Sequence, residues 1–126
     1  MENRKASIIV VDDDITSLTI AKRDLASLYR VLTVPSGKTF FQFLEKMTPD
    51  LILLDIEMSG MDGYEVISKL KSTKETEHIP VIFLTAKTDS ESEMKGLSLG
   101  AVDYIKKPFS RELLIERVGL QLSKSS

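Results

Sequence analysis

Short apolar runs of strand length alternate along the chain with longer stretches in which apolar residues recur every three or four positions. The runs are IIVV at 8–11, LILL at 51–54, VIFL at 81–84 and VDYI at 102–105. The first three have no apolar–polar alternation, which is typical of strands buried on both faces of a parallel sheet. A further run, Tyr29 to Val34, is weaker and more polar, and we expect it at an edge of the sheet.

The stretches between these runs have the spacing of helices with one buried face. Asp14 is predicted to cap the first helix and Ser110 the fifth. Ser90 and Glu93 have the spacing of a capping box at the fourth helix, and Gly100 stands where a C′ residue closes it. The expected buried stripes are Ile15, Leu18, Ala21, Leu25 and Leu28; Phe40, Phe43, Leu44 and Met47; Val66, Ile67 and Leu70; Met94 and Leu97; and Leu114, Ile115, Val118 and Leu122.

Strict alternation of five strands with five helices predicts right-handed crossovers and a doubly wound α/β fold, with helices on both faces of a parallel sheet. At 126 residues the chain has the length of a single domain, which we assign to residues 1–126 with a core of about residues 6–122. In open sheets of this kind, ligands bind beyond the carboxyl ends of the strands, where the strand order reverses. The side chains that follow the strands are therefore the first candidates for a functional site.

Composition and charge narrow the classes of function. The chain has 17 basic and 19 acidic residues and a formal net charge of -2, so it carries no electrostatic footprint for nucleic acid or for an anionic membrane. It contains no cysteine, which excludes disulfides, thiolate chemistry and cysteine-ligated metals. The segment MENRKAS leads into an apolar run without a signal-peptide core, and no apolar stretch approaches the roughly 20 residues that span a bilayer. We therefore expect a cytoplasmic protein.

Each of the four apolar runs is followed by polar residues suited to a metal ion or a phosphoryl group. Asp12 and Asp13 follow the first run, Asp55 the second and Thr85 the third, and Lys107 comes soon after the last. Three carboxylates brought to one edge would repel one another unless a cation neutralised them. A hard divalent ion such as Mg²⁺, which prefers oxygen ligands and retains waters, would resolve that conflict.

The same residues could handle a phosphoryl group. A bound metal ion can bridge a carboxylate to a phosphoryl oxygen and offset the charge that develops in the transition state. Lys107 would add a second positive charge, and the Thr85 hydroxyl could donate a hydrogen bond to a phosphoryl oxygen. One carboxylate would then act as the nucleophile and form an acyl phosphate.

Four segments resemble, in order and spacing, the motifs of one known family, the receiver domain of two-component response regulators. They are IIVVDDD (8–14), PDLILLDIEMSGMDG (49–63), VIFLTA (81–86) and GAVDYIKKPF (100–109). The resemblance covers nearly the whole chain and implies the flavodoxin-like (βα)5 fold, whose five-stranded parallel sheet has the order 2-1-3-4-5. It also implies a phosphorylation-dependent signalling switch rather than an enzyme that acts on a separate substrate.

The resemblance assigns roles to the acidic residues that match the family motifs. Asp55 would accept the phosphoryl group from a histidine kinase or a phosphotransfer protein. Asp12, Asp13 and Asp55 would hold Mg²⁺, for which Mn²⁺ could substitute. The backbone carbonyl of Glu57 would be a further ligand of this ion.

The later motifs would contact the phosphoryl group and transmit the signal. By resemblance, Lys107 would bind the phosphoryl group, and Pro108 would follow a cis peptide bond. Thr85 and Tyr104 would form a switch pair, in which the hydroxyl moves toward the phosphoryl group and the ring turns inward. This movement would reshape the face of the fourth helix, fifth strand and fifth helix, where an output domain, a downstream protein or a second copy of the chain would dock. A purely structural interpretation stays open for both residues, because threonine is common in turns and tyrosine is common in strands.

Two features limit what the resemblance carries over. Ser59 stands where the family usually has proline, and we expect this to loosen the loop after Asp55. Glu57 and Lys87 occupy positions that in this family flank the entrance used by attacking water. We hypothesise that they pair across this entrance and tune the lifetime of the phosphoryl group, although an exposed ion pair contributes only about 0–1 kcal/mol.

Two other interpretations stay open at this point. A haloacid-dehalogenase-like phosphohydrolase could use Asp12 and Asp14 as its nucleophile motif. That family has glycine and a small residue where this chain has Ile15 and Thr16, and it gives no role to Asp55. A degenerate receiver could instead act only as a binding module.

Overall fold

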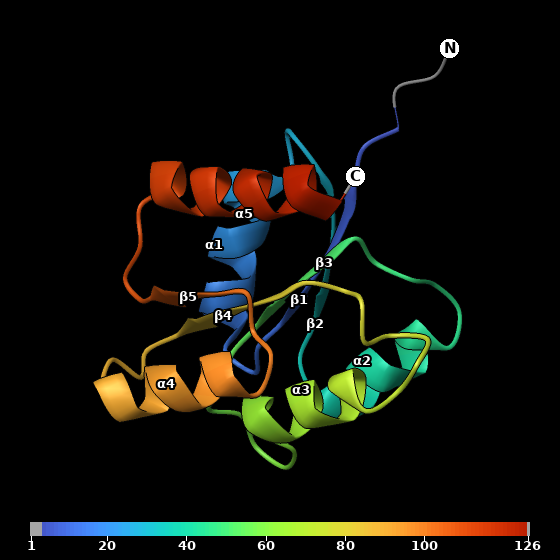
Figure 1. The fold of residues 1–126 in the computed structure, drawn as a ribbon. Helices are drawn as coiled ribbons and strands as arrows, with labels where there is room; N and C mark the ends of the chain where they lie inside the picture. The colour runs from blue at the N-terminus through green and yellow to red at the C-terminus, as the bar shows by residue number, and fades with distance from the viewer. Residues whose placement is uncertain (1–3, 126) are drawn as a thin grey trace.

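The computed structural model describes residues 4–125, in which five strands alternate with five helices (Figure 1). The strands are β1 (Ser7–Val11), β2 (Arg30–Val34), β3 (Leu51–Leu54), β4 (Val81–Thr85) and β5 (Asp103–Lys106). The helices are α1 (Ile15–Leu25), α2 (Gly37–Leu44), α3 (Gly63–Lys71), α4 (Ser90–Ser98) and α5 (Arg111–Ser125). No helix in this part of the chain has both the length and the apolar character needed to cross a membrane.

The five strands are parallel and lie in the order β2-β1-β3-β4-β5, which confirms the doubly wound, flavodoxin-like sheet. β3 and β4 are buried at every position, as their uninterrupted apolar runs predicted. β2 is mostly half-buried and lies at one edge, as its more polar composition predicted. The hydrophobic pattern alone thus identified which strands are central.

Helices cover both faces of the sheet and divide the core into two layers (Figure 1). α1 and α5 lie on one face, where Ile8 and Ile82 are buried, and α2, α3 and α4 lie on the other, over Ile9 and Phe83. Within the sheet, β2 lies next to β1 on one side and β3 lies next to β1 on the other, so the strand order reverses between β1 and β3. The carboxyl ends of β1 and β3 therefore flank the crevice in which such folds bind ligands.

The buried face of α1 is shorter than its spacing predicted. Leu18, Ala21 and Leu25 are buried, but Ile15 is 76% and Leu28 45% exposed. The prediction was wrong for these two because Ile15 is the first residue of the helix, beyond the end of β1, and Leu28 lies past its last turn.

α4 differs from its prediction at its first turn and on its apolar face. Asp89 rather than Ser90 is the N-cap, because the aspartate side chain accepts the amide hydrogen bond that closes the first turn. Met94 is 70% and Leu97 41% exposed, so the predicted buried stripe is wrong. Gly96 is the residue that faces the sheet, because α4 approaches the strands too closely for a larger side chain.

The other helix caps and buried helix faces largely agree with the sequence prediction. Ser110 caps α5 by accepting a hydrogen bond of 3.0 Å from the amide three residues later. Gly100 has a φ of +115°, the left-handed conformation that favours glycine after a helix end. Leu114 and Val118 of α5 are fully buried, whereas Phe43 at the margin of its stripe is 37% exposed.

Candidate functional site

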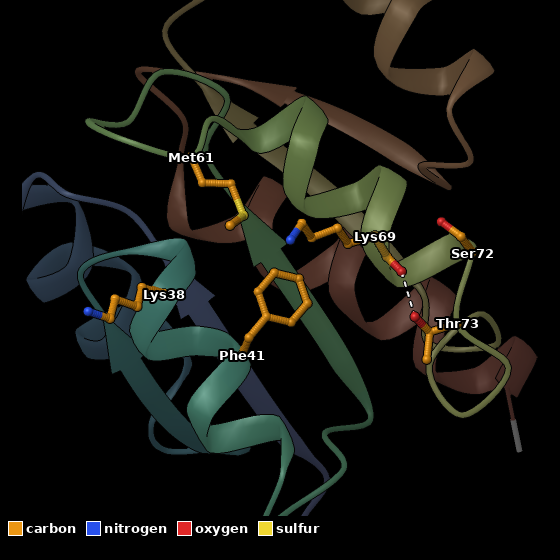
Figure 2. Close-up of a pocket in the computed structure, with 6 residues that line it drawn as sticks. All are labelled: Lys38, Phe41, Met61, Lys69, Ser72 and Thr73. Atoms are coloured by element: carbon orange, nitrogen blue, oxygen red, sulfur yellow. Dashed lines mark hydrogen bonds between the residues drawn. The ribbon is translucent and has the colours of Figure 1, made fainter.

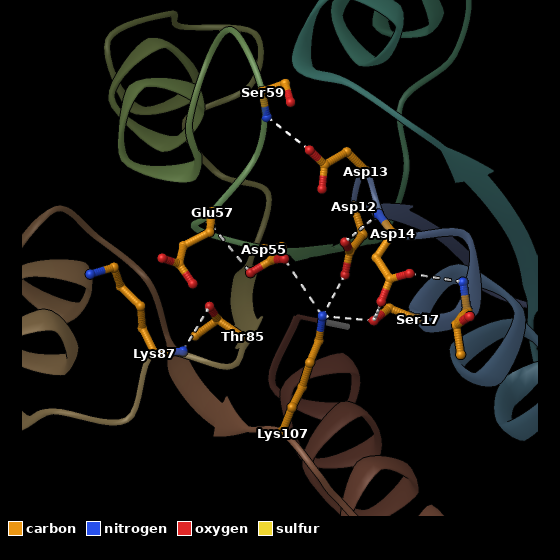
Figure 3. Close-up of polar contacts among 11 residues, drawn as sticks. Asp12, Asp13, Asp14, Ser17, Asp55, Glu57, Ser59, Thr85, Lys87 and Lys107 are labelled. Carbon is orange, nitrogen blue, oxygen red and sulfur yellow. Dashed lines mark hydrogen bonds and ion pairs between the residues drawn. The ribbon is translucent and has the colours of Figure 1, made fainter.

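The predicted site residues gather at the carboxyl edge of the sheet (Figure 3). Asp12 directly follows β1, Asp55 directly follows β3, and Thr85 is the last residue of β4. Lys107 follows β5, and its side chain extends toward the two aspartates. Parallel strands end at the same edge, so residues far apart in the sequence become neighbours here.

The ammonium group of Lys107 lies at the centre of this cluster. Its Nζ is 2.7 Å from Oδ2 of Asp12 and 3.5 Å from Oδ2 of Asp55. It also donates a hydrogen bond of 2.9 Å to Oγ of Ser17, in the first turn of α1. The Ser17 hydroxyl itself donates a hydrogen bond of 3.0 Å to Oδ2 of Asp14. Ser17 was not identified from the sequence, because the only sign of its role was its position in the first helical turn after the acidic run.

Both acids that share Lys107 are buried, with exposed fractions of 2% for Asp12 and 7% for Asp55. Burial raises the pKa of Asp12 above its ordinary value, and the negative charge of Asp55 adds to that rise. Hydrogen bonds from Lys107 and from the Asp14 amide lower the pKa of Asp12 but do not offset its burial. Additional positive charge at this site would therefore be favourable.

Asp13 lies at the rim of the cluster and connects two loops. It is exposed, and its Oδ2 accepts a hydrogen bond of 2.8 Å from the Ser59 amide (Figure 3). We expected Ser59 to loosen the loop because it replaces a proline. A proline would lack the amide that makes this bond, so Ser59 ties the loop after β3 to the end of β1.

The donor set fits a hard divalent cation by its chemistry. Asp12, Asp13 and Asp55 present carboxylate oxygens at one edge, and two of the three are buried around a single ammonium group. Within residues 4–125, no three acidic, histidine or cysteine side chains are already arranged around one metal position. In the present arrangement Lys107 supplies the positive charge between Asp12 and Asp55.

Gly63, the first residue of α3, packs directly against the backbone after β3. A Cβ atom there would collide with the carbonyl oxygen of Asp55 and lie 2.7 Å from Cα of Ile56. The Gly63 amide donates a hydrogen bond of 2.8 Å to the Ile56 carbonyl. Asp62 and Glu65 form a reciprocal capping box that fixes the start of the helix. The position of Asp55 thus depends on a glycine whose role the sequence pattern did not reveal.

Thr85 is fully buried, and its Oγ1 accepts a hydrogen bond of 3.3 Å from the Lys87 amide. The side chains of Lys87 and Glu57 lie on the same side of Asp55 (Figure 3). Among the ion pairs of the described residues, none joins Glu57 to Lys87. The pairing that we predicted across the entrance is therefore not formed in this arrangement.

Tyr104 points into the protein and is only 6% exposed. Its hydroxyl donates a hydrogen bond of 2.9 Å to the backbone carbonyl of Lys87. Burial raises the pKa of Tyr104 to about 12. The ring thus has the inward orientation that the resemblance associates with the phosphorylated form. Further along β5 and the following loop, the Lys107–Pro108 peptide bond is cis.

Two cavities formed by the described residues lie near the elements of the site, and neither is lined by Asp12, Asp13 or Asp55. One cavity of about 670 Å³ lies between α2 and α3, where Nζ of Lys69 is 5.9 Å from the centroid of the Phe41 ring (Figure 2). It is lined by Lys38, Phe41, Met61, Lys69, Ser72 and Thr73. A smaller cavity of about 350 Å³ adjoins Lys107 and is lined by Ser17, Ile20, Ala86, Lys107, Pro108 and Phe109. The smaller cavity therefore reaches the acidic cluster through Lys107 and Ser17, which both line it.

Comparison with known proteins identifies one family. The family model of the response regulator receiver domain matches residues 8–119. A probable cyclic di-GMP phosphodiesterase from Vibrio cholerae is 46% identical over 118 residues, which are 94% of this chain and 27% of that protein. The chain thus spans about a quarter of that relative's length, and the activity in the relative's name is not carried to this chain by the match.

Solved structures agree with this match. A response regulator from Chloroflexus aurantiacus has a TM-score of 0.91 and 30% identity, covering 95% of this chain and 99% of that one. The receiver domain of the sensor histidine kinase PA1611 from Pseudomonas aeruginosa has a TM-score of 0.86 and 28% identity, covering 94% and 98%. That domain has a magnesium ion coordinated in its active-site cleft. The haloacid-dehalogenase-like interpretation finds no support in these matches.

Proposed function

The chain belongs to the response regulator receiver domain family, and from this premise we propose that it is a phosphorylation-dependent switch in which Asp55 accepts the phosphoryl group. The observation that supports Asp55 is its position at the end of β3, where Nζ of Lys107 lies 3.5 Å from its Oδ2. Asp12 shares the same ammonium group and completes the polar cluster. The phosphoryl donor would be a histidine kinase or a phosphotransfer protein in the cytoplasm.

The transfer would leave the phosphoryl group as an acyl phosphate. A carboxylate oxygen of Asp55 would attack the phosphorus atom, and the bond from phosphorus to the donor's histidine nitrogen would break, returning its electron pair to the imidazole. Lys107 would stabilise negative charge on the phosphoryl oxygens, and the Thr85 hydroxyl would donate a hydrogen bond to one of them. Later attack by water on phosphorus would release inorganic phosphate and restore the carboxylate. The chain would thus catalyse only its own phosphorylation and dephosphorylation.

A divalent cation would complete the site. Asp12, Asp13 and Asp55 would hold Mg²⁺, or Mn²⁺ in its place, together with the backbone carbonyl of Glu57. When bound, the ion supplies positive charge to the phosphoryl oxygens during transfer. The burial that raises the pKa of Asp12 supports this assignment, because it makes added positive charge favourable.

Incubation of the full chain with acetyl phosphate and Mg²⁺ tests the assignment of Asp55, because a small phosphodonor needs no partner protein. We expect mass spectrometry to show the gain of one phosphoryl group, and borohydride reduction with peptide mapping to place it on Asp55. Asp55→Asn should take up no label, whereas Asp50→Asn, at the opposite end of β3, should match the wild type. Label on Asp12, or label that persists in Asp55→Asn, would contradict the proposal. No label in the wild type would favour a degenerate receiver that only binds partners.

The surface formed by α4, β5 and α5 would carry the output. The hydroxyl of Tyr104 donates a hydrogen bond to the carbonyl of Lys87, which precedes α4, and the Lys87 amide donates a hydrogen bond to Oγ1 of Thr85. A movement of Thr85 toward a phosphoryl group would therefore reach the start of α4 through the backbone of Lys87. An output domain, a downstream protein or a second copy of this chain would dock on that surface, where Met94 and Leu97 are exposed.

We also propose that Glu57 and Lys87 influence how long the phosphoryl group persists, because their side chains lie on the same side of Asp55. In Lys87→Ala we expect the half-life of the label, after removal of acetyl phosphate, to change by up to about fivefold, the range of an exposed charge interaction. Lys69→Ala, on α3, is the control for removing a lysine away from the acids. An unchanged half-life in Lys87→Ala would end this proposal.

A further inference from the structure

Helix α4 buries little apolar surface of its own. Of the nine residues of α4, all of which the structure describes, Gly96 alone is buried, while Met94 is 70% and Leu97 41% exposed. Most helices in proteins are held by the burial of an amphipathic face rather than by their own propensity. Because the side chains of α4 provide almost none of that burial, directional contacts from neighbouring elements have a large share in fixing its position.

Tyr64, in the first turn of α3, makes two such contacts with α4. Its hydroxyl donates a hydrogen bond of 3.0 Å to the backbone carbonyl oxygen of Ser92. The Nζ of Lys95 lies 4.3 Å from the centroid of the Tyr64 ring, within the range of a cation–π interaction. α4 therefore contacts Tyr64 through its backbone and, about one turn later, through a side chain.

Tyr64 is also one end of a row of aromatic rings that runs beneath α4. Its ring centroid lies 5.9 Å from that of Phe83, and Phe83 lies 6.0 Å from Tyr104. A Cβ atom on Gly96 would approach Phe83 to 2.9 Å, so α4 comes close to the sheet directly over this row. At the other end, the Tyr104 hydroxyl holds the carbonyl of Lys87 in the segment that leads into α4. The tyrosine hydroxyl from α3 thus holds α4 itself, and the tyrosine hydroxyl from β5 holds the segment that precedes α4.

The end of α3 that carries Tyr64 is packed against the proposed phosphoacceptor. Gly63, which precedes Tyr64, donates a hydrogen bond to the Ile56 carbonyl and leaves no room for a Cβ atom against the backbone of Asp55. A displacement of the backbone after β3 therefore reaches Tyr64 through a single intervening residue. This route from Asp55 to α4 is separate from the one through Thr85.

We propose that Tyr64 is a positioning residue, a latch from α3 that holds α4 in its present position and sets how readily α4 shifts when the phosphorylation state of Asp55 changes. The dependence on phosphorylation rests on the proposed function, whereas the contact between Tyr64 and α4 does not. A tyrosine with only a structural role would stabilise the protein as a whole, chiefly through its ring. A latch predicts that removing the hydroxyl alone frees α4 and leaves the other helices unchanged.

Hydrogen exchange of Tyr64→Phe in the full chain, without phosphodonor, tests the contact itself. We expect peptides from α4 to exchange about fivefold faster than in the wild type, the effect of one net hydrogen bond, while peptides from α1 and α5 keep their rates. Tyr29→Phe is the matched control, because it removes the same hydroxyl from the layer of α1 and α5 and should leave α4 unchanged. Unchanged exchange of α4 in Tyr64→Phe, or equal acceleration in every helix, would overturn the latch.

Exchange of the phosphorylated chain tests the link to the switch. With acetyl phosphate and Mg²⁺, we expect phosphorylation to change the exchange of α4 by a larger factor in the wild type than in Tyr64→Phe, whose latch is already open. Label on Asp55 is measured in the same samples. If both proteins carry label and α4 responds by the same factor, Tyr64 has no part in the switch and the proposal is overturned. If neither carries label, the proposed function and the switch role fail together, while the exchange without phosphodonor still decides whether Tyr64 holds α4.

Discussion

One ammonium group balances two carboxylates that are nearly sealed from water. Nζ of Lys107 contacts Asp12 at 2.7 Å and Asp55 at 3.5 Å, and both acids are buried. Removing one partner of such a buried pair typically costs about 3–5 kcal/mol, because a buried charge is left uncompensated. A phosphoryl group on Asp55 would compete for Lys107. A metal ion would then have to neutralise the negative charge of Asp12 in place of Lys107. Metal binding and phosphoryl transfer would therefore depend on each other.

The burial of Tyr104 predicts how stability depends on pH. Its pKa is raised to about 12 in the folded protein, whereas an unfolded tyrosine has a pKa of about 10. Below about pH 10 both states keep the proton; between about pH 10 and 12 only the unfolded state loses it, so the stability contributed by Tyr104 is lost as the pH rises. In urea unfolding, the wild type should lose about 2 kcal/mol more than Tyr104→Phe between about pH 9 and about pH 11.5. Parallel stability curves for the two proteins would contradict this interpretation.

The charged site residues could be predicted from the sequence because a strand end fixes where the next side chain lies. Asp12, Asp55 and Lys107 follow apolar runs whose ends the parallel sheet brings to one edge. Ser17 and Ser59 could not be predicted in the same way. The contact of Ser17 with Lys107 depends on a side-chain conformation, and that of Ser59 uses a backbone amide that every residue except proline carries.

Helix α4 shows how close approach to the sheet can replace apolar burial. Its exposed Met94 and Leu97 leave Gly96 as the point of contact with Phe83, which is fully buried. A larger residue at this point would have to displace a ring that is enclosed on all sides. The glycine therefore sets how near α4 can lie to the sheet, while the tyrosine hydroxyls set how firmly it is held there.

Replacing each of two helical glycines by alanine should have opposite effects on the free energy of unfolding. In Gly96→Ala the new Cβ would lie 2.9 Å from Phe83, and overpacking of about 1–3 kcal/mol should exceed the gain of about 1 kcal/mol in helix propensity. In Gly119→Ala the new Cβ would meet only the Tyr29 hydroxyl, at 3.8 Å, so the propensity gain of about 0.5–1 kcal/mol should remain. Urea unfolding of both variants measures the difference. Stabilisation by both substitutions would show that α4 can move away from the sheet without cost.

The strands were easier to predict than the helix faces, for a physical reason. Central strands such as β3 and β4 are enclosed on both sides, so their residues are apolar, except Thr85 at the end of β4, and the signal is nearly continuous. A helix face has to be inferred from spacing, and spacing does not show where the neighbouring layer ends. Ile15 and Leu28 keep the period of α1 but lie at or beyond its ends. Met94 and Leu97 keep a helical spacing in α4 but remain exposed.

The fold and the site form together, because the acids that would bind a metal ion come from the ends of different strands. Asp12 and Asp13 follow β1, and Asp55 follows β3, so an unfolded chain does not hold these carboxylates close to one another. A ligand that binds only the folded protein stabilises it by mass action. Metal binding should therefore be measurable as stability even without any phosphodonor.

Magnesium should raise the free energy of unfolding of this protein, by about 2.7 kcal/mol at a concentration of about 100 times Kd. Urea unfolding followed by circular dichroism, in MgCl₂ and in EDTA at matched ionic strength, measures the gain. Asp13→Asn keeps an oxygen that can accept the Ser59 amide but removes an exposed carboxylate, so it should fold normally and gain less from magnesium. Asp50→Asn, at the amino end of β3, should gain as much as the wild type. An equal gain in Asp13→Asn and the wild type would remove Asp13 from the metal site, and no gain in any of the three proteins would remove the metal site itself.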